Sequence, residues 1–168
     1  MEGRRATHSD TLDAIGWMAQ SCFKLERYKE AEDLWREQLA GRRATQGDTH
    51  SDTLCAIGWV AQSCFELKRY KEAEELRREE LAGHRATQGD THSDTLNAIG
   101  WVAQSCFELK RYKEAEELWR EELAGRRATQ GDTHSDTLNA MGGVAQSCFE
   151  ANRYEEAEQL RREKLAGH

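Results

Sequence analysis

Two residue types that could bind a metal or take part in catalysis recur at fixed positions in this sequence. A histidine opens each His-Ser-Asp-Thr-Leu stretch, and a cysteine follows fourteen residues later. Imidazole and thiolate groups ligate zinc, and they also serve as the base and the nucleophile of covalent catalysis. The residues concerned are His8, His50, His92 and His134, with Cys22, Cys64, Cys106 and Cys148.

The spacing of these residues argues against both uses. Equivalent residues return every 42 positions, and in stacked helices they would lie roughly 10 Å apart, which is too far to share an ion. Disulfides need Cα atoms within about 7 Å, so we expect the cysteines, including the isolated Cys55, to be reduced. Because no base, nucleophile or ligand set converges in one pocket, we predict no catalytic residue, no metal site, no cofactor and no enzyme activity.

The 42-residue period also defines the elements that carry these residues. It divides the chain into repeats 8–49, 50–91, 92–133 and 134–168, which we expect to form one domain over 1–168. The second and third repeats differ at only three positions, which indicates recent duplication. Residues 3–7 match the tail of a repeat and the last repeat ends inside its second helix, so we expect a segment of a longer array.

Within each repeat, apolar residues follow helical spacing in two runs. The first run predicts a helix over 9–25 and the second a helix over 28–42, and no proline interrupts them. Gly47 can adopt a positive φ after the second helix. Thr49 and Asp52 have the spacing of a capping box, and this threonine recurs at Thr7, Thr91 and Thr133. Such helix pairs cannot bury their apolar stripes alone, so we expect them to stack.

Four features recur along the repeats: a His-Ser-Asp-Thr-Leu start, a small alanine on the first helix, an RY-EAE-L run on the second helix and a Gly-Asp linker. This pattern resembles the 42-residue tetratricopeptide repeats of kinesin light chains, whose repeats have an HPDTL-type start. The resemblance covers nearly the whole chain, and it implies an all-α fold, a right-handed α-solenoid of stacked helix–turn–helix repeats that serves as a protein-binding scaffold. The matching residues of one repeat are His50, Asp52, Thr53, Leu54, Ala61, Arg69, Tyr70, Glu72, Ala73, Glu74, Leu76, Gly89 and His92.

Four positions depart from that family pattern. Ser51 stands where the family usually has proline, and Lys68 stands where a glycine usually closes the turn between the helices. Gly83 replaces a branched apolar residue. Trp59 replaces an asparagine that lines the peptide-binding groove of kinesin light chains. The fold is therefore expected to carry over, whereas the family's particular peptide-binding chemistry is not.

A second stripe runs along the first helix of each repeat, beside the apolar stripe. In stacked helical repeats this side lines the concave surface, where indoles can anchor a partner segment and amides can bond its main chain. The alternative is that each tryptophan packs into the neighbouring repeat and the glycine before it makes room. The predicted partner-binding residues are Trp17, Gln20, Trp59, Gln62, Glu66, Asn97, Trp101, Gln104, Glu108, Asn139, Gln146 and Glu150.

One position of the second helix alternates between tryptophan and arginine from repeat to repeat. The residues are Trp35, Arg77, Trp119 and Arg161. Two interpretations stay open. The alternation predicts either cation–π stacking between consecutive second helices or drift within an ancestral two-repeat unit.

The charge of the chain bears on its partners. The formal net charge is -7, which opposes phosphate groups, so we expect neither nucleic acid nor membranes as partners. The second stripe ends in Lys24 in the first repeat and in glutamate in the others, which favours a basic or neutral protein or peptide segment. No apolar run has the length of a membrane span or the form of a signal peptide, and we expect a cytoplasmic protein.

Two functions are therefore predicted as alternatives. The first is a non-catalytic scaffold that binds a protein or peptide segment on the concave surface. The second is a self-associating structural array without a dedicated peptide ligand, because near-identical repeats can stack end to end in homo-association.

Overall fold

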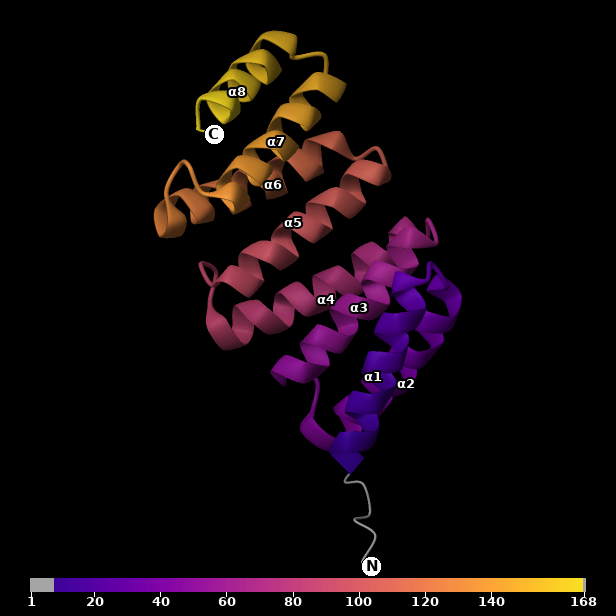
Figure 1. Ribbon diagram of the computed structural model, residues 1–168. Coiled ribbons are helices and arrows are strands. Elements are labelled where there is room, and N and C mark those ends of the chain that lie inside the picture. The colour runs from indigo at the N-terminus through magenta and orange to yellow at the C-terminus, as the bar shows by residue number, and fades with distance from the viewer. Residues whose placement is uncertain (1–7, 168) are drawn as a thin grey trace, which may run out of the picture. The chain divides into compact units, whose positions relative to one another are not determined.

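The computed structural model describes residues 8–167, which form eight α-helices and, within that range, no strand (Figure 1). Each repeat contributes a first helix, helix A, and a second helix, helix B. The all-α prediction is thus confirmed. The helices A are α1 (His8–Lys24), α3 (Ser51–Glu66), α5 (Ser93–Glu108) and α7 (Ser135–Glu150), and the helices B are α2 (Tyr28–Gln46), α4 (Tyr70–Gln88), α6 (Tyr112–Gln130) and α8 (Tyr154–Ala166).

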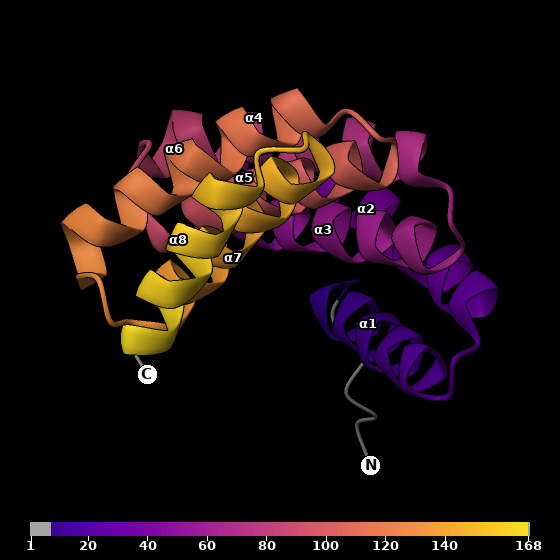
Figure 2. The same ribbon diagram turned by 90° about the horizontal axis from the view of Figure 1, so that it is seen from above.

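The described residues divide after Gly83 into two compact units. In the first unit α2 packs against both α1 and α3, and in the second unit α6 packs against α5 and α7 while α7 also packs against α8. Figure 2 shows the same helices from a second direction. Neighbours in sequence are therefore neighbours in space within each unit, which is the arrangement of a helical solenoid.

The starts of α3, α5 and α7 differ from the predicted threonine cap. The N-cap of α3 is His50 rather than Thr49, and the ring Nδ1 of His50 accepts a hydrogen bond from the backbone N–H of Asp52 at 3.2 Å. The same bond forms at His92 and His134. The imidazole satisfies one of the amide groups that a helix start leaves without a partner. The recurrent histidine therefore has a structural role at the helix start.

The linker before helix A is held by a different threonine. The Oγ1 of Thr53 donates to the carbonyl of Gly47 at 2.7 Å, and Gly47 has the predicted positive φ, 87°. Because glycine adopts this conformation without a Cβ clash, α2 continues to Gln46, four residues past the predicted end, and stops at Gly47. The predicted cap at Thr7 lies outside the described residues.

The turn from helix A to helix B closes without glycine. Lys68 has a φ of 61°, in the left-handed region. Around it the backbone N–H of Arg69 donates to the carbonyl of Cys64 at 2.8 Å, and that of Lys68 donates to Phe65 at 2.8 Å, which is the bonding of a Schellman motif. Non-glycine residues hold the same conformation in the other repeats, at Glu26, Lys110 and Asn152.

The core of each unit depends on close approach between the two helices of a repeat. In the first unit Leu54, Ile57 and Val60 of α3 are almost fully buried. A Cβ on Gly83 would lie 2.3 Å from Leu54 Cδ2, so a branched residue at position 83 would collide with that leucine. The departure from the family pattern at Gly83 is therefore a packing requirement of this core.

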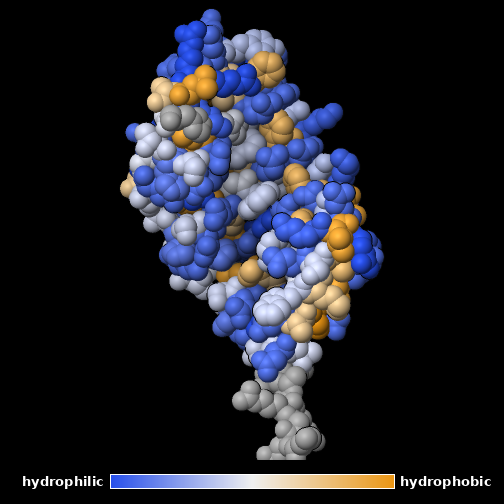
Figure 3. Space-filling view, viewed as in Figure 1, coloured by the Kyte–Doolittle hydropathy of each residue, from blue (hydrophilic) through white to orange (hydrophobic). Residues whose placement is uncertain are grey.

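Four of the five cysteines are buried inside the repeats. Cys22, Cys64, Cys106 and Cys148 are buried, Cys55 is exposed, and no disulfide joins any of the five, all of which lie in the described part of the chain. Polar and apolar side chains are mixed on the molecular face in Figure 3. None of the described helices combines the length and the apolar character needed to cross a bilayer.

Replacing Lys110 with glycine should stabilise the protein. A side chain in the left-handed region costs about 1–2 kcal/mol, whereas glycine forfeits roughly 0.5–1 kcal/mol of backbone entropy. We expect urea melts of Lys110→Gly to show a free energy of unfolding higher by about 0.5 kcal/mol. Asn152→Gly is the matched control, because asparagine tolerates this conformation, and it should change little. A larger gain at Asn152 than at Lys110 would contradict this account.

Candidate functional site

Each unit carries a groove between two helices A and the helix B that follows the first of them. The first groove encloses about 220 Å³ between α1, α2 and α3, and the second encloses about 500 Å³ between α5, α6 and α7. Every residue that lines the first groove has a counterpart two 42-residue periods later in the lining of the second. The first lining comprises Asp13, Gly16, Trp17, Gln20, Trp35, Gln38, Arg42, Asp52, Cys55, Ala56 and Trp59.

Most of the predicted partner-binding residues line these grooves. Trp17, Gln20 and Trp59 line the first groove. Four of the predicted residues line neither groove, namely Gln62, Glu66, Glu108 and Glu150. Gln62, Gln104 and Gln146 donate from Nε2 to Glu66, Glu108 and Glu150 at 2.8, 3.1 and 3.4 Å. The residues that line the second groove are Asn97, Trp101, Gln104, Asn139 and Gln146.

The glycine that precedes the tryptophan on helix A makes room for a side chain of its own repeat rather than for that tryptophan's packing. A Cβ on Gly16 would lie 2.4 Å from Gln38 Nε2, and a Cβ on Gly100 would lie 2.6 Å from Glu122 Oε2. Side chains from helix B therefore reach across the helix-A backbone toward the groove. Because glycine leaves this space free, polar side chains of helix B contribute to the lining of each groove.

Trp59 combines the two interpretations that the sequence left open. Its ring stacks on Trp35 of α2, with centroids 5.0 Å apart and planes inclined by 15°, which is packing into the neighbouring repeat. It also remains 37% exposed and lines the first groove. One face of the indole thus stabilises the stack of repeats while the rest of the ring is available to a ligand.

The second groove is larger because a glycine replaces the corresponding tryptophan. Gly143 occupies the position of Trp59, and Trp119 occupies that of Trp35. A Cβ on Gly143 would lie 2.4 Å from the ring of Trp119, so the indole of Trp119 packs directly against the backbone of α7. The volume that the ring of Trp59 fills in the first groove is left open in the second.

A buried ion pair lies beside this open volume. Arg126 is 2% exposed and donates to Asp136 at 3.1 Å and to Glu122 at 3.4 Å. Burial raises the pKa of Glu122 to about 7, although Arg126 acts in the opposite direction. The corresponding residue of the first groove is the neutral Gln38, which donates to the Leu12 carbonyl at 2.9 Å.

Sequence reasoning missed the contribution of helix B to both grooves. In the second groove that contribution consists of Trp119, Glu122 and Arg126, which lie on one helical face three and four residues apart. The Trp–Arg alternation was the available signal, because its side chains reach helix A. Cation–π stacking between consecutive helices B stays a prediction. Trp35 stacks on helix A, and the Arg161 guanidinium lies 5.1 Å from the ring centroid of Phe149, also on helix A.

Glu122→Gln should stabilise the protein at alkaline pH. Because burial disfavours the carboxylate, the folded state loses stability as the pH rises from about 4.5 through 7. The glutamine variant should unfold with a free energy higher by about 2 kcal/mol at pH 8 and should match the parent near pH 4. Glu117→Gln, an exposed change on the same helix, is the control. A Glu122 variant that is equally stabilising at both pH values would refute the assignment.

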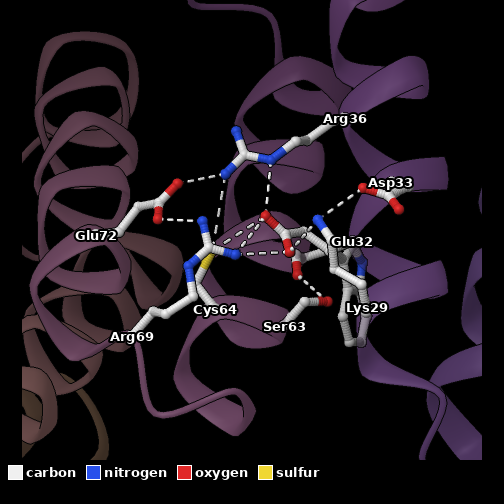
Figure 4. A network of polar contacts seen from close by, with 9 residues as sticks. Lys29, Glu32, Asp33, Arg36, Ser63, Cys64, Arg69 and Glu72 are labelled. Carbon is white, nitrogen blue, oxygen red and sulfur yellow. Dashed lines mark hydrogen bonds and ion pairs between the residues drawn. The ribbon is translucent and has the colours of Figure 1, made fainter.

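A second polar cluster joins consecutive repeats (Figure 4). Glu32 of α2 is 1% exposed and accepts hydrogen bonds from Arg36 at 2.9 Å and from Arg69 of the next repeat at 2.7 Å. Both guanidinium groups also pair with Glu72. We call these four residues an ion-pair ring. The second unit repeats the ring with Glu116, Arg120, Arg153 and Glu156.

The geometry of this ring could be mistaken for a metal site. Glu32, Cys64 and Glu72 offer three ligand atoms within 4.8 Å of one another. However, two arginines already pair with the carboxylates, and burial together with these two glutamates raises the pKa of the Cys64 thiol to about 11. A protonated thiol beside two guanidinium groups is a poor cation ligand. The arrangement suits a structural contact.

Glu32→Gln should destabilise the protein at neutral pH. Burial alone would raise the pKa of Glu32, but hydrogen bonds from Arg36, Arg69 and Lys29 outweigh it and lower the pKa to about 2. The ion pair therefore stabilises the fold above about pH 4.5 and is lost as the pH falls toward 2. Thermal and urea melts should show a loss of about 3 kcal/mol at pH 7 that vanishes near pH 2. The exposed Glu30→Gln should cost little. Equal losses for the two variants would rule out a special role for Glu32.

Comparison with known proteins agrees with this geometry. Residues 94–163 match the family model of the tetratricopeptide repeat, and a search of the curated proteins found no match. Two crystal structures of a candidate kinesin light chain from Podosopora anserina, with nearly identical TPR-like repeats, superpose with TM-scores of 0.86 and 0.83. Both are 20% identical to this chain, and the match covers 99% of it and 78% of theirs.

BtubC from P. vanneervenii is similar in fold at lower identity. Its TM-score is 0.86 at 13% identity, over 98% of this chain and 67% of that one. The fold is therefore a tetratricopeptide-type α-solenoid, a class whose members generally serve as protein-interaction scaffolds. Solved kinesin-light-chain-like repeat arrays share this fold, as the sequence resemblance implied.

Proposed function

We propose that this chain is a non-catalytic scaffold that binds a segment of a partner protein along its helices A. The observation that carries the proposal is the second groove, where Gly143 leaves space beside Trp119 and Trp101. Indoles and amides line this space, and such groups recognise side chains and main chain rather than make or break bonds. The fold class supports the same function.

The charge along helix A favours a basic or neutral segment. Glu108 and Glu150 stand beside the second groove, each hydrogen-bonded to a glutamine of its lining. Arg126 is already paired with Asp136, so little positive charge is available to an acidic ligand. The formal net charge of -7 likewise makes nucleic acid and anionic membranes unsuitable partners. Location in the cytoplasm stays a prediction, supported by the reduced cysteines.

Binding to peptides of equal length and varied charge tests this function. Fluorescence anisotropy at low salt should show tighter binding of basic and neutral peptides than of acidic ones. Glu108→Lys combined with Glu150→Lys should weaken the binding of basic peptides by about tenfold. Glu117→Lys, the matched control, adds positive charge on α6 outside the groove lining and should have a smaller effect. A clear preference for acidic peptides would defeat the proposal.

Filling the second groove provides an independent check of its location. Gly143→Trp should reproduce the stacked pair of the first unit, where Trp35 and Trp59 coexist in the same positions. We expect the variant to fold, since Trp119 can take the position beside the new indole that Trp35 holds beside Trp59. We expect it to bind peptide about tenfold more weakly. Retention of full affinity by the folded variant would place the binding surface elsewhere.

A further inference from the structure

The second repeat holds an arginine of its own helix B in a polar site. Arg77 of α4 donates from Nη1 to Glu80 at 2.8 Å and from Nη2 to Oε1 of Gln62 on α3 at 3.0 Å. The guanidinium and the carboxylate both lie over Gly58, where an added Cβ would be 3.0 Å from Arg77 Nη1 and 2.6 Å from Glu80 Oε1. A carboxylate, an amide oxygen and the space over a glycine therefore hold this side chain, which is 7% exposed.

The fourth repeat places an arginine against the same amide. Arg161 stands at the repeat position of Arg77 and donates from Nη2 to Oε1 of Gln146 at 3.3 Å. Its guanidinium also lies 5.1 Å from the ring centroid of Phe149. An arginine at this position thus reaches the glutamine of helix A in both repeats that carry it, and an aromatic ring can share the contact.

The third repeat keeps the two acceptors of this site and has a tryptophan in place of the arginine. Gln104 and Glu122 stand at the positions of the glutamine and the glutamate of the second repeat, and Trp119 stands at the position of the arginine. An added Cβ on Gly100 would be 2.6 Å from Glu122 Oε2, so the carboxylate lies over the glycine as it does in the second repeat. Trp119 carries no positive charge, and its ring N–H is its only side-chain donor. The third repeat therefore offers both acceptors without the arginine that fills them in the second.

The carboxylate of Glu122 is poorly compensated by its neighbours. Glu122 lines the second groove and is 7% exposed. Within residues 8–167 its one hydrogen-bond donor is Arg126, at 3.4 Å, and Arg126 also donates to Asp136 at 3.1 Å. This long contact does not outweigh burial, which raises the pKa of Glu122 to about 7. A second cation that reaches Glu122 through the groove would stabilise the carboxylate.

Two indoles line the same groove and suit a planar cation. Trp101 is 40% exposed, Trp119 packs against the backbone at Gly143, and both belong to the lining together with Gln104 and Glu122. A guanidinium is flat, so it stacks on an indole face while its N–H groups bond a carboxylate, whereas an ammonium group has no such plane. The groove encloses about 500 Å³, which leaves room for this group.

We propose that the second groove binds an arginine side chain of the partner segment, in a place over Gly100 that corresponds to the place of Arg77 over Gly58. The guanidinium pairs with Glu122, donates to Gln104 Oε1 and stacks on the indoles of the groove. This assignment rests on the proposed scaffold function, and it narrows the basic or neutral segment to one that contains arginine.

The first groove does not offer the same site. Gln38 stands at the position of Glu122 and donates to the carbonyl of Leu12 at 2.9 Å, so a neutral amide replaces the carboxylate of helix B. The ring of Trp59 also fills the volume that Gly143 leaves open in the second groove. Of the two grooves, the second is therefore the one that should select arginine.

Peptide pools that differ at one residue test this site. Each pool consists of short labelled peptides of equal length, with arginine, citrulline or lysine at the centre and randomised neutral residues around it. Citrulline keeps the shape of arginine without its charge, and lysine keeps the charge without the planar group. Fluorescence anisotropy should show that the native chain binds the arginine pool about tenfold more tightly than the citrulline pool, with the lysine pool between them.

Two variants of the groove should abolish this preference. Glu122→Gln keeps the shape of the side chain and removes its charge, so it should bind the arginine and citrulline pools equally. Trp119→Arg supplies the guanidinium from within the chain, as position 77 does in the second repeat, and should have the same effect. Glu117→Gln, an exposed change on α6 outside the groove lining, is the control and should keep the native preference. Circular dichroism would verify that each variant folds.

The possible outcomes separate this site from the scaffold function. If the native chain binds the three pools equally, the arginine site is overturned and the scaffold function still stands. A preference for arginine that survives in folded Glu122→Gln and in folded Trp119→Arg would also overturn the site. If no pool binds at all, the scaffold function fails together with the arginine site.

Discussion

α3 and α7 each lie between two helices B, and the other features of each unit depend on that placement. α3 is packed on one side by α2 of the preceding repeat, and on the other side it receives Gly83 of its own helix B against Leu54. α7 likewise lies between α6 and α8. Only small residues permit such close approach from two directions, which is why alanine and glycine recur along these helices.

The ion-pair rings determine the register of that packing. A carboxylate as deeply buried as Glu32 would be costly without partners, and its two arginines come from two successive repeats. The apolar stripe alone would tolerate sliding of one helix along another. The ring satisfies its hydrogen bonds in one register only, so polar and apolar contacts specify the same stacking.

The grooves arise from the same packing and differ by few residues. Both lie between two helices A and the helix B that follows the first of them, and both linings come from the same repeat positions. Trp59 completes a stacked pair and narrows the first groove, whereas Gly143 leaves the second groove open. An array of nearly identical repeats can thus carry grooves of different volume and charge, because single substitutions change both without changing the backbone.

The sequence by itself determined the helices, their order and the period at which they stack, because these depend on local spacing and on repetition. The stripe of Trp101, Gln104 and Asn139 could likewise be read from helical periodicity, and the structure brings these side chains to one groove. The threonine cap was mispredicted, because threonine and histidine both suit a helix start locally and only the linker geometry selects His50 as the cap. The tertiary structure alone decided that helix B supplies Trp119 and Glu122 to the groove and that Glu32 meets two arginines. Such contacts join residues of different helices, and their distances follow from how the helices pack rather than from spacing along the chain.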